Sequence, residues 1–186
     1  MSQEDPFGLY EDRGRTRVRP PPGAPRRAAP AEAGAVPVAS RDHPNPLVGA
    51  FAALLAFAPE LETPTAPSDP ETLRTRLLDG LIAARDGAVA RGVTLARADA
   101  AAWVVAALID DLALHTPWGD RSAWPRQPLV STVYGDVDAG EQFFTRLEEL
   151  ERHPTRDPEL LELMYFALAL GFQGKYRVPG RGVGAG

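Results

Sequence analysis

The sequence contains no cysteine, which excludes disulfide bonds, thiol catalysis and cysteine-ligated metal sites. Its longest uninterrupted apolar run covers residues 100–109, which is too short for a membrane-spanning helix of about 20 residues. The first residues are acidic and polar, unlike a secretory signal. A net charge of −5 argues against a nucleic-acid partner, because phosphate binding requires clustered positive charge.

The chain has 186 residues, of which 44% are hydrophobic, so it can bury a core of ordinary size. Residues 1–44 are rich in proline and arginine and poor in large apolar groups, a composition that predicts a disordered tail. We expect a helical domain over residues 45–177 and a linker over residues 178–186. The tail has seven Arg and six Asp or Glu, whereas the remainder has 13 basic and 19 acidic residues. The net negative charge therefore comes from the part that is expected to fold.

Three helix starts are predicted by an Asn or Asp that precedes a proline: Asn45-Pro46, Asp69-Pro70 and Asp157-Pro158. Ser68 is an alternative cap for the second. Apolar spacing predicts helices over about 45–62, 70–91, 97–115 and 158–172, and a further helix capped by Asp138 with Glu141 three residues on. Only residues 129–134 have strand-like composition, and a short helix or turn also suits them. The fold class is therefore all-α, with six to eight helices.

Asp110 and Asp111 end the most apolar helix, which we expect to be central and buried. Carboxylates there are costly unless they are solvated, paired or used. His115 lies four residues after Asp111 on the same face, so the two could form half of a metal site. A small metal-dependent hydrolase that uses Asp110, Asp111 and His115 is therefore an alternative function. The other interpretation is a solvated helix end, and because no second acidic or histidine cluster stands out, we expect no metal or other cofactor.

Other catalytic patterns are weak. The histidines His43, His115 and His153 have no serine partner in a G-x-S-x-G elbow. We expect Trp103, Trp118 and Trp124 to pack in the core, the last two holding a loop against it.

The glycine pair at Gly171 and Gly174, followed by Lys175, resembles a phosphate-binding loop. Its spacing is too short, Tyr176 replaces the required Ser or Thr, and a helix rather than a strand precedes it. The segment instead predicts a helix end capped by Gly171 or Gly174, with Lys175 and Arg177 facing the negative end of the helix dipole.

Taken together, these segments resemble the cytoplasmic domain of the TssL family, also called DotU or IcmH-like, of type VI and related type IVB secretion systems. The resemblance covers residues 45–177 and rests on pieces that occur in one order. They are Asn45-Pro46-Leu47, residues 107–111, Thr116-Pro117-Trp118-Gly119 with Trp124, Tyr134-Gly135-Asp136, Gly140-Glu141-Gln142-Phe143-Phe144, and residues 163–177 with Gly171, Gly174 and Tyr176. The family usually has Asp-Glu at Asp110-Asp111 and often His-Gly-Glu at Tyr134-Gly135-Asp136.

The resemblance implies a hook-like domain of two small helical bundles on the cytoplasmic face of the bacterial inner membrane. It implies a structural role without catalysis, with the IcmF-like protein TssM and the baseplate protein TssK as partners; a second copy of the chain is a further candidate partner. The family typically ends in one transmembrane helix, so we expect this chain to be trimmed at the membrane boundary. From the acidity of the folded part we expect Asp110, Asp111, Asp136 and Glu141 to contribute to partner binding.

Overall fold

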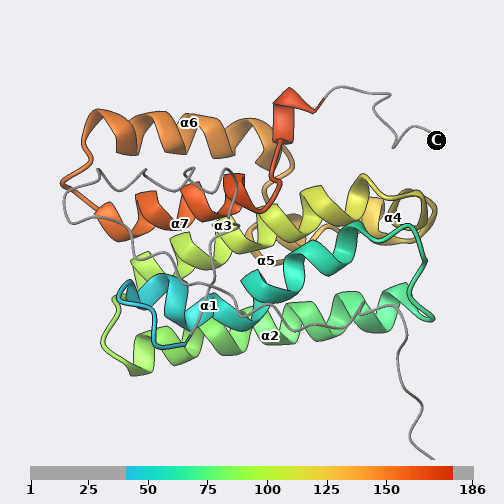
Figure 1. Ribbon diagram of the computed structural model, residues 1–186, viewed down its shortest axis with the longest axis horizontal. Coiled ribbons are helices and arrows are strands. Elements are labelled where there is room, and N and C mark those ends of the chain that lie inside the picture. Colours follow the sequence, from blue (N-terminus) through green and yellow to red (C-terminus); the bar gives the residue numbers. More distant parts are fainter. Residues whose placement is uncertain (1–40, 178–186) are drawn as a thin grey trace, which may run out of the picture. The chain divides into compact units, whose positions relative to one another are not determined.

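The computed structural model describes residues 41–177 (Figure 1). Most of the predicted tail and the whole predicted linker lie outside these residues. The described part contains α-helices and short 3-10 helices and no strand, which confirms the all-α prediction. The helices are α1 (Pro46–Phe57), α2 (Pro70–Ala90), α3 (Leu95–Leu114), α4 (Pro117–Arg121), α5 (Leu129–Tyr134), α6 (Ala139–Arg152) and α7 (Pro158–Ala169). The 3-10 helices are η1 (Ala58–Glu62), η2 (Trp124–Arg126) and η3 (Gly174–Tyr176).

The three helix starts predicted from Asn/Asp-Pro pairs are confirmed. Asn45 Oδ1 accepts from the Leu47 amide at 2.9 Å, and the Asp69 and Asp157 carboxylates accept from amides in the first turns of α2 and α7. Asp69, rather than Ser68, is therefore the cap of α2. Proline fits the first helical position because its missing N–H would have no partner inside the helix.

The prediction that the Asp138 side chain caps α6 is wrong. Asp138 directly precedes α6, but its carboxylate accepts no hydrogen bond from the helix. The backbone of Asp138 is not fully extended (φ −113°, ψ 44°), whereas a capping residue normally is. Its carboxylate instead lines a surface groove, described below.

Helices α2 and α7 end at glycines with positive φ, Gly92 (98°) and Gly171 (111°). In each case the next amide bonds back across the last turn, as Phe172 N does to Ala167 O at 3.0 Å. The prediction of Gly171 as a helix cap is confirmed. Arg177, which was expected to face the helix dipole, instead forms an ion pair with Asp111, as described below.

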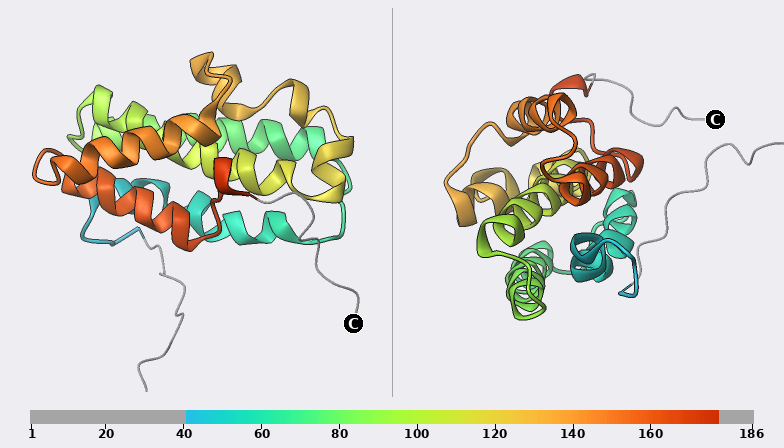
Figure 2. Two further views of the ribbon diagram at one scale, coloured as in Figure 1. Left: turned by 90° about the horizontal axis from the view of Figure 1, so that it is seen from above. Right: turned by 90° about the vertical axis from the view of Figure 1, so that its left-hand side faces the viewer.

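Helix α3 is central and buried as predicted, with almost every residue from Ala101 to Ala113 shielded from solvent. Helices α1 and α2 pack on one side of it and α6 on another, while α7 contacts both α1 and α6 (Figures 1 and 2). Both groups of helices pack against α3. Because they share α3, their apolar side chains form one continuous core.

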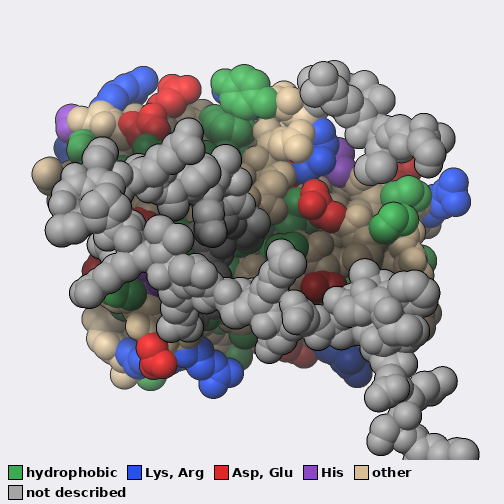
Figure 3. Space-filling model, in the orientation of Figure 1, with side chains coloured by type: hydrophobic (Ala, Val, Ile, Leu, Met, Phe, Trp, Pro, Cys, Tyr) green, Lys and Arg blue, Asp and Glu red, His purple; other side chains and the backbone are tan. Residues whose placement is uncertain are grey.

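The three tryptophans lie in this core, as predicted. Trp118 and Trp124 meet edge to face, with ring centroids 5.9 Å apart, and so hold the α4–η2 segment against α3. The outer surface of α6, by contrast, is polar, and Figure 3 shows acidic and basic side chains side by side along the edge that it forms. No helix within residues 41–177 has the length and apolar character to cross a membrane.

Candidate functional site

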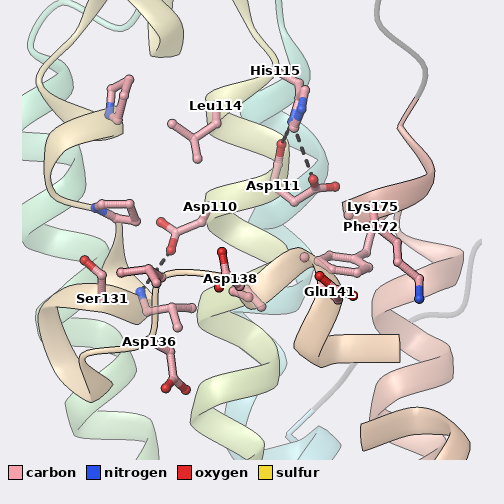
Figure 4. A pocket seen from close by; sticks show the side chains of 18 of the residues that line it. Asp110, Asp111, Leu114, His115, Ser131, Asp136, Asp138, Glu141, Phe172 and Lys175 are labelled. Atoms are coloured by element: carbon pink, nitrogen blue, oxygen red, sulfur yellow. Dashed lines mark hydrogen bonds and ion pairs between the residues drawn. The ribbon is translucent and has the colours of Figure 1, made fainter. Parts of the chain in front are cut away.

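A groove of about 580 Å³ lies between the last turns of α3, helix α5, the start of α6 and the segment around η3 (Figure 4). All four acids predicted to bind a partner line it: Asp110, Asp111, Asp136 and Glu141. Asp138 joins them, whereas the basic side chains in the lining are Arg126, Lys175 and, when protonated, His115. We call this hollow the acidic groove. The structure thus brings together carboxylates that come from two separate segments of the sequence, residues 110–111 and 136–141.

Asp110 is only 5% exposed and holds the start of α5. Its Oδ1 accepts from Trp124 Nε1 and the Leu129 amide, both at 2.8 Å, and its Oδ2 accepts from the Val130 amide at 2.9 Å. Burial raises the pKa of Asp110 to about 6, although these three hydrogen bonds act in the opposite direction. The strand-like stretch 129–134 begins as a helix because Asp110 satisfies its first free amides.

Asp111 is 8% exposed and holds the chain that follows α7. Its Oδ2 accepts from the Gln173 amide at 2.9 Å and from Arg177 Nη2 at 2.8 Å. The side chain of Arg177 is itself largely buried, with 17% exposure. A buried ion pair of this kind needs good geometry and added hydrogen bonds to offset its loss of hydration, and Asp111 has both.

The proposed metal site does not assemble from these residues. Asp110 and Asp111 point to different sides of α3, and each carboxylate already has protein donors (Figure 4). His115 Nδ1 lies 2.6 Å from the Asp111 carbonyl oxygen and 3.5 Å from its carboxylate. Within residues 41–177 no three His, Asp or Glu side chains come close enough together to hold a metal ion. The hydrolase alternative therefore gains no support.

Asp136 fixes the turn between α5 and α6. Its Oδ2 accepts from Trp103 Nε1 at 2.8 Å, and Arg146 of α6 reaches the same oxygen at 3.4 Å. The Arg146 guanidinium also lies 3.8 Å from the centre of the Trp103 ring, a cation–π contact. Gly135, just before, has φ 74° and permits the sharp turn.

Glu141, at the start of α6, is the exposed acid of the predicted set. Neither Glu141 nor Asp138 forms an ion pair with any other described residue. Their charges therefore face solvent at the groove, whereas Asp110 is held by three neutral N–H donors and Asp111 by an amide and Arg177. In chemical terms the groove is a partly rigid acidic surface suited to Lys or Arg side chains.

The segment that follows α7 forms one wall of the groove. Phe172 stacks on Phe143 of α6 with centroids 4.0 Å apart, and Tyr176 meets Phe144 at 4.6 Å. Between these contacts the backbones of Gly140 and Gly174 approach so closely that a Cβ on Gly174 would lie 2.6 Å from the Gly140 oxygen. The motif residues of 140–144 and 172–176 thus have a packing role.

Other motif residues stabilise the far ends of the domain. Asn45 Nδ2 donates to the backbone carbonyl oxygen of Glu159 and to the Glu162 carboxylate, both in α7 and both at 2.8 Å. Its Oδ1 caps α1. Pro117 begins α4 directly after Thr116, whose hydroxyl accepts from the Gly119 amide. These motifs therefore maintain the fold around the groove and do not themselves line it.

Sequence reasoning missed several residues of the site. Trp103, Arg146 and Arg177 each bind a predicted acid, yet none was assigned to it. Arg177 lies in the segment 163–177, which resembles the family, so its position in that segment could have marked it as a structural residue. Nothing local marks Arg146, because its partners lie on α3 and on the turn before α6.

The model of the family "Type VI secretion system protein DotU" matches residues 46–184. Among solved structures, the cytoplasmic domain of TssL from Acinetobacter baumannii is similar with a TM-score of 0.65 and 28% identity, over 72% of this chain and 86% of that chain. TssL from Vibrio cholerae is similar with a TM-score of 0.64 and 28% identity, over 73% of this chain and 84% of that chain. SciP/TssL from enteroaggregative Escherichia coli 042 has a TM-score of 0.63 and 24% identity, over 74% of this chain and 80% of that chain. This similarity supports the fold alone.

The comparison with curated protein sequences finds no significant match. The family match nevertheless covers most of the chain, and the similar solved structures are also TssL proteins. The chain therefore belongs to the DotU (TssL) family of type VI secretion system proteins, which are structural components of the system and not enzymes.

Proposed function

We propose that this chain is a docking module of the type VI secretion membrane complex, held at the cytoplasmic face of the bacterial inner membrane. In this proposal a transmembrane helix follows the described domain in the whole protein. The domain pairs with the IcmF-like protein TssM and recruits the baseplate through TssK. The family match supports this role, as does the resemblance of residues 45–177 to cytoplasmic domains of the family.

The observation that carries the docking role is the convergence of the predicted acids on one groove. A partner that presents Lys or Arg would meet the two exposed carboxylates of Asp138 and Glu141 there, beside three further acids that line the groove. Such a contact depends on opposite charges at a water-exposed surface, so it steers association and weakens with added salt.

The acids of the groove have two different roles in this proposal. Glu141 and Asp138 are exposed and provide charge that a partner reaches directly. Asp110 and Asp111 shape the groove by fixing α5 and the segment after α7. Charge reversal at Asp110 and Asp111 together is therefore expected to abolish partner binding, chiefly through damage to the groove walls.

The sharpest test changes Glu141, because it is exposed and holds no other part of the fold. We expect Glu141→Arg to reduce co-purification of TssK with the chain at least several-fold, and the remaining binding to be less sensitive to salt. Glu148→Arg is the matched control, since Glu148 is an exposed acid of the same helix outside the groove. Both variants are expected to keep the melting temperature of the parent. Equal binding by all three proteins would refute the acidic-groove proposal.

A further inference from the structure

A second pocket lies between α3, the second half of α6 and the start of α7, with a volume of about 350 Å³. Its apolar lining consists of Ala100 and Val104 from α3, Leu150 from α6, and Leu160 and Met164 from α7. The two residues from α3 and the two from α7 are each four positions apart, so each of these walls is about 6 Å long at 1.5 Å per residue. The pocket therefore suits a compact group and not an extended chain.

The lining of this pocket changes from apolar to charged toward solvent. Val104 and Met164 are 2% and 1% exposed, so they form its deep end. Glu149 and Arg156 are exposed and lie at its mouth, and the partly exposed Arg146 also lines it. We call it the arginine-rimmed pocket. A ligand that fits it has an apolar body and a polar group at one end, as is usual for small-molecule sites.

Arg146 is already held in position by the protein. Its guanidinium lies 3.8 Å from the centre of the Trp103 ring, and its Nη2 lies 3.4 Å from both Asp136 Oδ2 and Gln142 Oε1. These two hydrogen bonds use one nitrogen, whereas a guanidinium has five N–H donors, so donors remain for a ligand. Binding to a side chain that is already ordered also loses less conformational entropy.

The charged residues of the lining favour a ligand with a single negative charge. They are Arg146 and Arg156 against Glu149, a positive excess in a chain whose net charge is −5. Neither Arg156 nor Glu149 forms an ion pair with another residue of the range 41–177. A carboxylate matches the planar guanidinium of arginine through paired hydrogen bonds. A phosphate dianion would be repelled more strongly by Glu149, which makes a carboxylate the better match.

We propose that the arginine-rimmed pocket binds a small carboxylate that carries one aromatic ring. The ring lies between Val104 and Met164, and the carboxylate lies at Arg146 and Arg156. The pocket has about twice the volume of an engineered apolar cavity of roughly 150 Å³ that holds benzene, so a ring and a short linker fit. Met164 favours an aromatic ring, because thioether sulfur makes favourable contacts with ring edges. No residue lines both this pocket and the acidic groove, so the proposal goes beyond the proposed function.

The first test is a titration of the isotope-labelled chain with phenylpropionate, followed by NMR. We expect saturable shifts of the amide signals of residues 100–104, 146–150 and 160–164, with a Kd on the order of 1 mM, as suits a ligand of this size. Phenylpropionamide, which has the same shape and no charge, is expected to bind about tenfold more weakly or less. Equal binding of the two compounds, shifts confined to other residues, or shifts that do not saturate would overturn the proposal.

Two charge variants at the mouth are expected to change the affinity in opposite directions. Arg156→Gln should weaken phenylpropionate binding by about threefold to tenfold, because it removes an attraction, and Glu149→Gln should strengthen it by about twofold, because it removes a repulsion. Arg152→Gln and Glu148→Gln are the matched controls, since both are exposed charges of α6 outside the pocket. All four positions are exposed, so the melting temperature is expected to be unchanged. Equal effects of Arg156→Gln and Glu149→Gln, or effects no larger than those of the controls, contradict the proposal.

Ala100→Leu tests the apolar part of the pocket. Ala100 is partly exposed and lines the pocket, so a leucine there extends into the space that the ring would occupy. We expect phenylpropionate binding to be lost, whereas Ala96→Leu, an exposed control on the same helix, keeps the Kd of the parent. A folded Ala100→Leu protein with the parent's Kd overturns the proposal. Both variants are expected to keep TssK binding, because the acidic groove is unchanged, so a failure of this proposal is distinct from a failure of the proposed function.

Discussion

Asp110 and Asp111 are neighbours in the sequence, but each stabilises a different part of the domain. Because they lie on successive positions of a helix, their side chains diverge, one toward α5 and the other toward the segment after α7. Burial without partners would cost each carboxylate several kcal/mol, so the three donors to Asp110 and the two to Asp111 are essential to the fold. The sequence could predict the cost of these charges, but not the donors that offset it.

Asp110→Asn is expected to reduce the free energy of unfolding at pH 7.5 by about 1–3 kcal/mol. The carboxamide carries donors on one side, so it cannot accept from all of Trp124, Leu129 and Val130. Urea unfolding followed by circular dichroism measures the difference. Asp120→Asn, an exposed control on α4, is expected to change it little.

The same pair of proteins reports the titration of Asp110. Burial raises the pKa of Asp110 to about 6, above its ordinary value of 3.8. Between these pH values the folded protein retains a proton that the unfolded chain has lost, so this group contributes less stability as pH rises from about 4 to 6. The wild-type protein should therefore gain stability relative to Asp110→Asn when the pH is lowered from 7.5 to 4.5. A loss instead would mean that the hydrogen bonds outweigh burial.

At the scale of elements, the helix starts were predictable because capping is local. In such a pair the Asn or Asp side chain accepts from the first free amides of the helix, and the proline fixes its own φ near the helical value. Helices α1, α2 and α7 all begin at such pairs. Helix α5 was ambiguous because its decisive acceptor, Asp110, lies 19 residues before Leu129. The same limit applied to Asp138, whose carboxylate faces the groove instead of capping α6.

Alanine substitutions at two glycines test how much side-chain space the helices leave at each position. Gly119→Ala places a Cβ 1.8 Å from the Ala113 oxygen, a backbone atom in the last turn of α3 that cannot easily move. We expect a loss of stability above about 2 kcal/mol, measured by thermal or urea unfolding. Gly87→Ala in α2 meets only the end of the Arg91 side chain, at 3.6 Å. It should stabilise the protein by about 0.5–1 kcal/mol through helix propensity, and similar effects of the two changes would contradict this account.

Across the whole described domain, long-range ion pairs join helices that are distant in sequence. Arg97 at the start of α3 contacts both Asp157 and Glu159 at the start of α7. Burial alone would raise the pKa of Asp157, but hydrogen bonds from Arg97 and the Leu160 amide outweigh it and lower that pKa. The Asp111–Arg177 pair similarly ties α3 to the end of the domain. The sequence predicted the family and the helices, but not these partners, because they depend on tertiary packing.

Arg177→Gln is expected to loosen the segment after α7 while leaving the central helices intact. It removes the ion pair with Asp111 and the restraint on residues 172–177, but not the apolar contact of Phe172 with Phe143. Amide hydrogen exchange in that segment should accelerate by about tenfold, which corresponds to roughly 1.4 kcal/mol. Exchange in α3 should be unchanged. Arg121→Gln, on the surface of α4, is the control. Equal acceleration throughout the domain would indicate a global role instead.

The contact of Asn45 with α7 has a consequence for synthesis on the ribosome. Asn45 lies at the first turn of α1, but it donates to the Glu159 oxygen, 114 residues later. At a translation rate of about 5–20 residues per second, the start of α1 waits roughly 6–23 s before this acceptor exists. During that interval the apolar face that α1 buries against α7 is uncovered. Nascent chains are therefore expected to depend on chaperones until the last helix emerges.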